Sequence, residues 1–462
     1  MSGMPSSLNE NTIVEGVIWK RMLIFFLPIL FGNFFQQFYS VADAAIVGRA
    51  LGSDALAAID STWSLFRIPT TFFIGVSAGA TIQLSQAFGA KDGPRCSRLI
   101  HTAAAAALLF GLLLSAAVAI ACPWLLRLIQ VPEDIFAQSL TYSRVYSAGL
   151  FIILLFNIGC AVSRAIGDSK SPFYFLVISS LTNILLDLLF VLVFHWGVAG
   201  AAAATVLAQG LSAVLVIRAL TRAEEPCRLS LREIRLDLKV FSEIFRTGFP
   251  VGLQSMLYPF ANMLIQRGLN GFGTASIAAW AINGKLDFVL WLVIDSFAVA
   301  CSTFVAQNYG AKKYRRARQS AAISLAMACG IVIGLSVLFY FFTETFGRLF
   351  LDDDAATIRL AAEMMRFIAP WYVTAVFGEV LASAARSTGK TFASMVITLS
   401  ASCALRIVWI LFIAPLKPSP FATLAAYPVS WVTCSAAFLI YCGIYAKKID
   451  GQPLPSLGSP AD

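Results

Sequence analysis

The sequence predicts an all-α integral membrane protein with twelve transmembrane helices in two pseudo-symmetric six-helix lobes. Three observations support this prediction. Of the 462 residues, 58% are hydrophobic and only 13% are charged, which is more apolar surface than a soluble domain needs. The apolar residues form runs of about 20 residues or more, the length that crosses the hydrocarbon core as a helix. Several motifs also recur in the second half of the chain at a constant offset.

The twelve predicted spans differ in composition, and the second, eighth and tenth carry the most polar residues. The break between the fifth and the sixth rests on the short stretch "HWG". The spans run approximately over residues 22–46, 55–86, 99–122, 136–163, 172–196, 197–220, 247–269, 277–307, 320–343, 357–385, 391–414 and 422–446.

The repeat is visible in two pairs of segments separated by one offset. "LGSDALAAID" at 51–60 matches "FGTASIAAWA" at 272–281, and "SQAFGAKD" at 85–92 matches "AQNYGAKK" at 306–313. Each half holds an even number of spans, so both halves enter the membrane from the same side. Their pseudo-two-fold axis should therefore run along the membrane normal, a symmetry suited to rocking two lobes around a central cavity.

We divide the chain into an amino-terminal lobe (1–220), a cytoplasmic linker (221–246) and a carboxyl-terminal lobe (247–462). Within the linker, apolar residues of 228–245 recur at spacings of three and four, which predicts an amphipathic helix on the membrane surface. Most of the 34 Lys and Arg fall in the terminal segments and in alternate loops. By the positive-inside rule this places both termini in the cytoplasm, as expected for a multi-pass protein of the cell (inner) membrane.

The first span carries a polar face in an otherwise apolar helix. Gln36, Tyr39 and Asp43 are spaced three and four residues apart and so share one side, which should face a cavity between spans. Burying an ion in hydrocarbon costs at least about 2.5 to 3.5 kcal/mol, so an intramembrane acid marks a pathway or a paired site. Pro28 lies two turns earlier, where its missing N–H donor should let the helix bend.

Two more spans of the amino half carry matching polar pairs. Asn183 and Asp187 lie four residues apart in the fifth span, and Thr205 and Gln209 do so in the sixth. Oxygen ligands of these types suit a proton or a hard monovalent cation. A purely structural role, with Asp43 bonded to Tyr39, is the competing interpretation.

The carboxyl half has different intramembrane polar groups. Leu264 or Ile265 occupies the repeat position of Asp43, and the stretch equivalent to "NILLD" carries Arg406 and Trp409. The cation chemistry is therefore not duplicated. A possible second polar site consists of Lys285, Asp287, Asp295 and Glu379, for which structural ion pairs and substrate contacts remain equally open.

Several other functions are disfavoured by the sequence. The basic residues are spread over short loops and form no single patch, so we expect no nucleic-acid partner. The nine cysteines are scattered without a CxxC spacing, and no metal or cofactor motif is present. "GVSAG" at 75–79 matches a serine-hydrolase pattern but lies inside an apolar span, where a helix-packing role is favoured. We therefore expect neither an enzyme nor a bound cofactor.

These motifs resemble those of the multidrug and toxic compound extrusion (MATE) transporters along nearly the whole chain. The resemblance rests on "QQFYSVADAAIVGRALGSDALAAI", "GVSAGATIQLSQAFGAKD", "SRAIGDSKSPFYF", "NILLD" and the echo "FVAQNYGAKK". It implies two six-helix lobes that export organic, often cationic, compounds in exchange for H⁺ or Na⁺. It also implies a cation site at Asp43, Asn183, Asp187 and Thr205, substrate contacts at Gln36, Tyr39, Asn157 and Gln209, and a bending proline at Pro28.

The expected function is thus a secondary active antiporter that works by alternating access as a monomer in the lipid bilayer. Its partners would be small organic cations or amphiphilic drugs, and its only metal ion would be Na⁺ at the amino-lobe site. A flippase for lipids or lipid-linked oligosaccharides from the same superfamily is the alternative, although such a protein should have a more cationic cavity.

Overall fold

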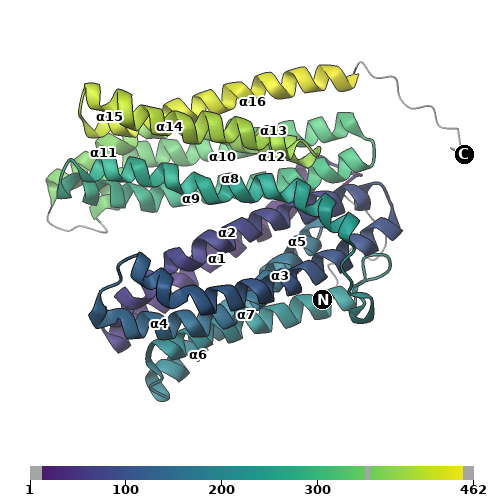
Figure 1. Cartoon of the computed structure of the whole chain (residues 1–462). Helices are drawn as coiled ribbons and strands as arrows, with labels where there is room; N and C mark the ends of the chain where they lie inside the picture. The colour runs from purple at the N-terminus through teal and green to yellow at the C-terminus, as the bar shows by residue number, and fades with distance from the viewer. Residues whose placement is uncertain (1–12, 349–353, 451–462) are drawn as a thin grey trace, which may run out of the picture.

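The computed structural model describes residues 13–348 and 354–450, and these residues form two bundles of long helices that lie side by side. Figure 1 shows α1–α7 in one bundle and α8–α16 in the other, with the two ends of the chain toward the same side of the molecule. The predicted two-lobe, all-α membrane fold is confirmed.

The amino lobe contains seven α-helices. They are α1 (Ile18–Leu51), α2 (Ser53–Gly89), α3 (Gly93–Leu128), α4 (Glu133–Ala148), α5 (Leu150–Ala165), α6 (Lys170–Asp187) and α7 (Gly197–Thr221). Helices α4 and α5 form one span bent by 46°. The bend lies at Gly149, where a Cβ atom would stand 2.4 Å from the side chain of Val206 in α7.

The carboxyl lobe repeats this plan with more breaks. Its long helices are α8 (Leu238–Asn270), α9 (Thr274–Gly310) and α10 (Tyr314–Arg348). Its shorter ones are α11 (Ala355–Ile368), α12 (Tyr372–Ser387), α13 (Thr391–Thr398), α14 (Leu405–Val408), α15 (Pro420–Leu424) and α16 (Ala426–Asp450). Short 3₁₀ or π segments join several of these pieces, so that α11 with α12, and α13 with α14, each read as one span.

Ten spans in the described part of the chain are long and apolar enough to cross a membrane, and the bent α4–α5 pair makes an eleventh. The remaining predicted span, the seventh (247–269), corresponds to α8, which is 33 residues long but is not among the helices that are apolar enough by the same measure. A few of the spans begin with a side-chain cap. Asp92, for example, precedes α3 and accepts a hydrogen bond from the N–H of Arg95 at 3.0 Å.

The helix predicted over residues 228–245 is wrong in its first half. A 3₁₀ turn occupies Leu231–Glu233, and α8 begins only at Leu238. A tertiary contact overrides the helical periodicity here: the Ser230 N–H donates to Nε2 of His101 in α3 at 3.0 Å. Cys227 is buried beneath this segment, and that burial raises the pKa of its thiol to about 12.

The two lobes pack tightly at the end where the termini lie, through glycines of α2 and α8. A Cβ atom on Gly75 would stand 2.4 Å from Cα of Gly252, and one on Gly79 would stand 2.4 Å from the carbonyl oxygen of Ile244. The "GVSAG" stretch is therefore a helix-packing face, as expected. Small residues allow the two backbones to approach more closely than any side chain would permit.

The repeated "GAK" motifs also meet each other at this end. Cβ atoms on Gly89 and Gly310 would each overlap a carbonyl of the opposite lobe, at Gln307 and Gln86 respectively. The Gln86 amide donates to the Ser387 carbonyl at 2.7 Å, and Gln307 donates to the Ala165 carbonyl at the same distance. The repeat thus builds a two-fold symmetric contact that closes one end of the molecule.

Candidate functional site: a polar centre in the amino lobe

Helix α1 contacts both lobes, and Pro28 lies between two of these contacts. Contact with the carboxyl lobe continues past the proline, since the Asn33 amide donates to Oγ of Ser296 in α9 at 3.5 Å. Before the proline, the Phe26 ring stacks on Phe297 of α9 with centroids 3.9 Å apart. After the proline, a Cβ on Gly32 would meet Leu176 of α6 at 3.6 Å, in the amino lobe. A proline removes one backbone hydrogen bond and is the usual place for a helix to bend. Bending of α1 at Pro28 would therefore move the polar face relative to the carboxyl lobe.

Helices α6 and α7 supply the second side of the centre. Asn183 and Asp187 are both buried on α6, and Asp187 has no exposed surface. The Asn183 amide donates to Oγ1 of Thr205 on α7 at 3.5 Å, and Thr205 donates to its own helix at the Ala201 carbonyl. Immediately after Asp187 the chain forms a π-helical turn, Leu188–Val193. Such turns are rare and are frequent at functional sites.

The structure brings Asp43 of α1 next to Asp187 of α6. The two carboxylates are close enough to interact strongly, and Tyr39 lies near both of them and beside Gln209 of α7. The predicted grouping of the α1, α6 and α7 side chains is thus present in the geometry, which brings together residues about 140 positions apart in the chain.

The oxygens of this centre lack donors. Five buried acceptor atoms have no hydrogen-bond partner among the described residues: Oδ1 of Asp43, Oδ1 of Asn183, both carboxylate oxygens of Asp187 and Oε1 of Gln209. Buried polar atoms are almost always bonded, and unbonded acceptors beside two carboxylates are costly. A proton or a monovalent cation supplies what these oxygens lack, so the donor set fits the expected coupling ion.

Two tyrosines of α4 border the polar centre, and they are not among the predicted site residues. Tyr142 is buried near Asp43, Asp187 and Tyr39, and its ring stacks on Tyr146 with centroids 5.8 Å apart. The signal was available in the i, i+4 spacing of the two tyrosines inside a predicted span. Their phenols add neutral polar groups at the side of the acids that faces α4.

Asn157 and Gln36, the other two predicted substrate contacts, are not joined to the acids. The Asn157 amide donates to the Ile153 carbonyl of its own helix α5 at 2.8 Å. Gln36 is exposed on α1, one turn before Tyr39. The structure therefore joins Tyr39 and Gln209 to the acids, while Asn157 is satisfied locally and Gln36 is free to meet a ligand.

Two of the three acids predicted for the carboxyl-lobe site have a bonded partner. Glu379 on α12 forms an ion pair with Arg386 at 2.8 Å, and Asp287 on α9 accepts a hydrogen bond from the Tyr372 phenol. Asp295 is solvent-accessible and lies near Glu379 and Arg386. Lys285 is exposed and forms no ion pair with any described residue, so the four predicted residues do not form one cluster.

Arg406 occupies the centre of the carboxyl lobe, with 1% of its surface exposed. Its guanidinium donates to Ser430 at 2.8 Å, to Asn262 at 2.7 Å and to the Tyr258 phenol at 3.1 Å. It also lies within 5 Å of the ring centroids of Tyr258 and Tyr427. Neutral acceptors and aromatic faces thus hold this cation in place.

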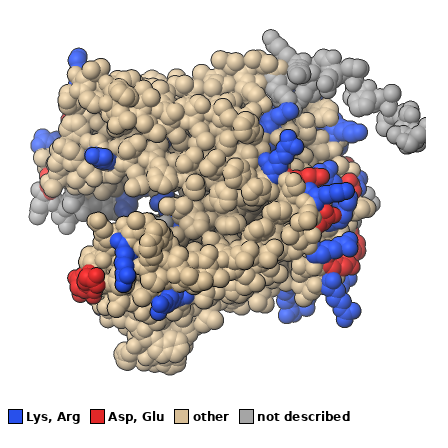
Figure 2. All heavy atoms as spheres, in the orientation of Figure 1, with Lys and Arg blue, Asp and Glu red and all other residues tan. Residues whose placement is uncertain are grey.

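A cavity of about 320 Å³ lies between the lobes at the end opposite the glycine contact. Arg67 of α2 and Asn262 and Gln266 of α8 line it, together with apolar residues and Tyr427. Figure 2 shows the surface hollowed between the two lobes on that side. The molecule is therefore closed at the end of the termini and open between the lobes at the other.

The chain is similar to several proteins named for multidrug resistance, drug export or FAD transport. It is 27% identical to the probable multidrug resistance protein YoeA of Bacillus subtilis over 83% of this chain and 84% of that protein. It is 27% identical to an FAD transporter of Shewanella oneidensis over 75% of this chain and 77% of that protein. The multidrug export protein MepA of Staphylococcus aureus is 23% identical, with 76% of each chain covered.

Solved structures share the fold over almost the full length. An outward-facing multidrug resistance MATE transporter of the MOP superfamily aligns with a TM-score of 0.87 at 18% identity, covering 98% of this chain and all of the other. A MATE transporter in the straight conformation aligns with a TM-score of 0.88, also at 18% identity, covering 96% of this chain and 99% of that one.

The MatE family pattern matches the chain twice, over residues 28–189 and 250–412. The two matches correspond to the two repeats and together cover more than half of the sequence. The chain belongs to the MatE family of multidrug and toxic compound extrusion transporters.

Proposed function

We propose that the protein is a secondary antiporter of the cell (inner) membrane, with cytoplasmic termini, that exports organic cations or amphiphilic drugs in exchange for H⁺ or Na⁺. The names of its relatives support the substrate class, and the positive-inside distribution of charge supports the orientation. In that orientation the closed end faces the cytoplasm and the cavity between the lobes faces outward.

The observation that carries the proposal is the set of unbonded oxygens at Asp43, Asn183, Asp187 and Gln209. An incoming cation would be bound by Asp43, Asn183, Asp187 and Thr205, because these groups supply two negative charges and several neutral oxygens. Its positive charge would relieve the repulsion between the two carboxylates. The site is therefore expected to change shape when it is filled.

Helix α1 is the element that would transmit this change. It carries Asp43 at one end of its polar face and is fixed to the carboxyl lobe at Phe26, with Pro28 between them. Movement of the Asp43 segment would displace Gln36 and Tyr39, the proposed substrate contacts on the same helix. Binding of the cation and release of the drug are thereby linked through one helix, and Gln209 and Asn157 would complete the substrate site.

The ion gradient can drive this exchange, and for an uncharged substrate the membrane potential adds to it. Inward movement of one net charge supplies about 2.3 kcal/mol per 100 mV, enough for roughly a fifty-fold gradient of substrate. Exchange of one H⁺ or Na⁺ for one monovalent organic cation moves no net charge and draws on the ion gradient alone.

The decisive experiment measures efflux of a fluorescent organic cation from vesicles containing the purified protein, with Na⁺ and pH gradients imposed separately. We expect one gradient to drive efflux in the native protein and neither to do so in Asp43→Asn. Asp60→Asn, which changes an exposed carboxylate of α2, is the matched control and should retain activity. Full-rate pumping by Asp43→Asn would disprove the site assignment.

An anionic substrate is a second candidate, because the cavity between the lobes carries Arg67 and no acidic residue among its lining. One relative is named an FAD transporter, and FAD is a dinucleotide with two phosphates. The same vesicles should therefore also be tested with FAD. Transport that is lost in Arg67→Gln and retained in Asp60→Asn would favour this class.

A further inference from the structure

Two cavities lie beside each other along α3, outside the polar centre. The first, of about 340 Å³, is formed by the start of α3 and the linker and is lined by Arg98, His101, Arg232 and Arg235. The second, of about 270 Å³, continues from Ala103 to Phe110 on α3 and from Phe241 to Phe245 on α8. One cavity is basic and the other is apolar, and the same two stretches of chain line both.

We propose that these cavities together bind one anionic phospholipid of the cytoplasmic leaflet, with its phosphate at the three arginines and an acyl chain in the apolar pocket. The proposal rests on the proposed orientation, which puts this end of the molecule in the cytoplasm, and it does not depend on the transported substrate or on the coupling ion.

The basic cavity contains arginines that are available to bind an anion. Arg98, Arg232 and Arg235 are exposed, and none of their guanidinium groups bonds or pairs with a described residue. Of the two acids in the lining, Asp237 is committed to the N–H groups of Lys239 and Val240 at the start of α8, and Glu233 is exposed with its carboxylate 3.9 Å from Nε2 of His101. The lining thus carries one net positive charge, which matches the single negative charge of a phosphodiester. Basic pockets of this kind on the cytoplasmic side suit lipid head groups.

His101 fixes the shape of this cavity. Its Nε2 accepts from the Ser230 N–H at 3.0 Å, and its Nδ1–H donates to the Ser97 carbonyl at 2.7 Å. Both ring nitrogens are therefore used, and the linker is fastened to α3. Arg232 and Arg235, which follow Ser230 in the chain, are held above the first turns of α3, near Arg98.

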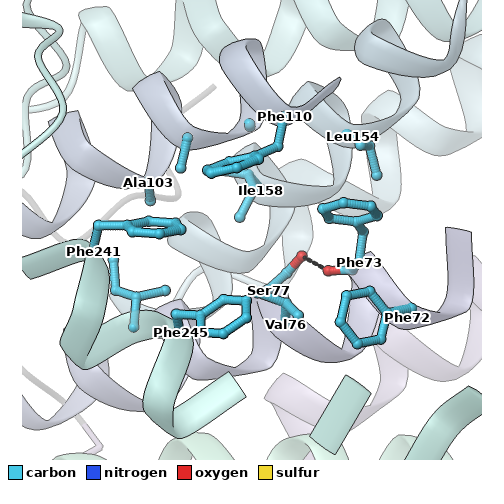
Figure 3. Close-up of a pocket in the computed structure, with 13 residues that line it drawn as sticks. Phe72, Phe73, Val76, Ser77, Ala103, Phe110, Leu154, Ile158, Phe241 and Phe245 are labelled. Carbon is cyan, nitrogen blue, oxygen red and sulfur yellow. Dashed lines mark hydrogen bonds between the residues drawn. The ribbon is translucent and has the colours of Figure 1, made fainter. Parts of the chain in front are cut away.

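The apolar cavity has room for an acyl chain, and its lining has no free polar group. Figure 3 shows Phe241 and Phe245 of α8 facing Phe110, Phe73 and Ile158 of the amino lobe. Its one hydroxyl, Ser77, already donates to the Phe73 carbonyl at 2.8 Å. Phe245, which lines the pocket, is 39% exposed, so the pocket opens toward the lipid-facing side.

The distance along α3 from the basic cavity to the far end of the apolar cavity agrees with the length of a lipid in one leaflet. Twelve residues separate Arg98 from Phe110, which is about 18 Å along a helix. One leaflet contributes about half of the roughly 30 Å hydrocarbon core, with the head group above it. The pocket joins α2, α3 and α5 of the amino lobe to α8 of the carboxyl lobe, so a bound chain would favour the state in which the lobes are closed at this end.

The test measures the thermal unfolding temperature of the detergent-purified full-length protein while phosphatidylglycerol, phosphatidylcholine or soluble glycerol phosphate is added. We expect phosphatidylglycerol to raise Tm at lower concentration than phosphatidylcholine, and glycerol phosphate to have no effect. The triple variant Arg98→Gln/Arg232→Gln/Arg235→Gln should need on the order of a hundredfold more phosphatidylglycerol, at about fivefold for each charge.

Two further variants separate a built site from general surface attraction. Arg222→Gln/Lys312→Gln/Arg315→Gln removes three exposed charges of the same end that line neither cavity, and it should respond like the native protein. Ala106→Phe fills the apolar pocket and should lose the response while keeping the arginines. Equal responses to both lipids, equal losses in the two triple variants, or a full response in Ala106→Phe would each overturn the proposal.

Discussion

The polar centres of the two lobes come from equivalent parts of a duplicated chain, yet they differ in sign and in completeness. The amino-lobe centre holds Asp43 and Asp187 with five buried oxygens that lack donors. The carboxyl-lobe centre holds Arg406, whose nitrogens donate to Ser430, Asn262 and Tyr258. An incomplete centre is suited to binding and releasing an ion, whereas a complete one fixes the position of helices. Both lobes have the same helical plan, but only the amino lobe has a centre of acids that lack hydrogen-bond donors.

The comparison is tested most strongly by removing one amino-lobe charge. In Asp187→Asn we expect gradient-driven efflux to fall to background, because the coupling ion loses one of its two carboxylates. We expect Tm to stay the same or rise, because the amide no longer repels Asp43 and can donate to it. Vesicle efflux and a thermal melt of the same preparation measure both. A large fall in Tm would show instead that Asp187 is a structural residue.

The opposite result is expected in the carboxyl lobe. Arg406→Met keeps much of the side-chain volume but leaves three acceptors without their donor, at about 1–3 kcal/mol for each buried group that stays unbonded. Tm should therefore fall clearly, while protein that remains folded keeps its dependence on the ion gradient. Arg406→Lys, which restores the charge but not the three-way geometry, should recover only part of the loss. Loss of ion dependence at unchanged Tm would contradict the structural role.

A third change tests whether the two centres communicate through the closed end. Gly79→Ala places a methyl group where the Ile244 carbonyl lies at 2.4 Å, so α2 and α8 can no longer approach as closely. We expect efflux to slow several-fold and the outward-open state to be depleted, as measured by spin-label distances between the lobes. Gly284→Ala on α9 has nothing within 4 Å and is the control. Equal effects of the two would show that the contact does not govern closure.

The general fold could be predicted from the sequence because span-length apolar runs and a fixed repeat offset are local signals. The grouping of Asp43 with Asn183 and Asp187 was also predictable, since each lies on a polar face that must avoid lipid. The π-helical turn after Asp187 could not be predicted, because it depends on packing against α7 rather than on composition. The prediction of a helix over the first half of the linker was wrong for the same reason, because the bond from Ser230 to His101 joins residues 129 positions apart.

Glu379 provides the finest test of the contrast, because it differs from Asp43 and Asp187 mainly in having a basic partner. It is paired with Arg386 at 2.8 Å. A carboxylate already compensated by an arginine gains little from an added cation. We therefore expect Glu379→Gln to change ion-driven efflux by less than about twofold, a loss below roughly 0.4 kcal/mol in the driving step. Initial efflux rates measured at several gradient strengths would resolve this difference, and a loss as deep as that of Asp187→Asn would show that both lobes carry the coupling ion.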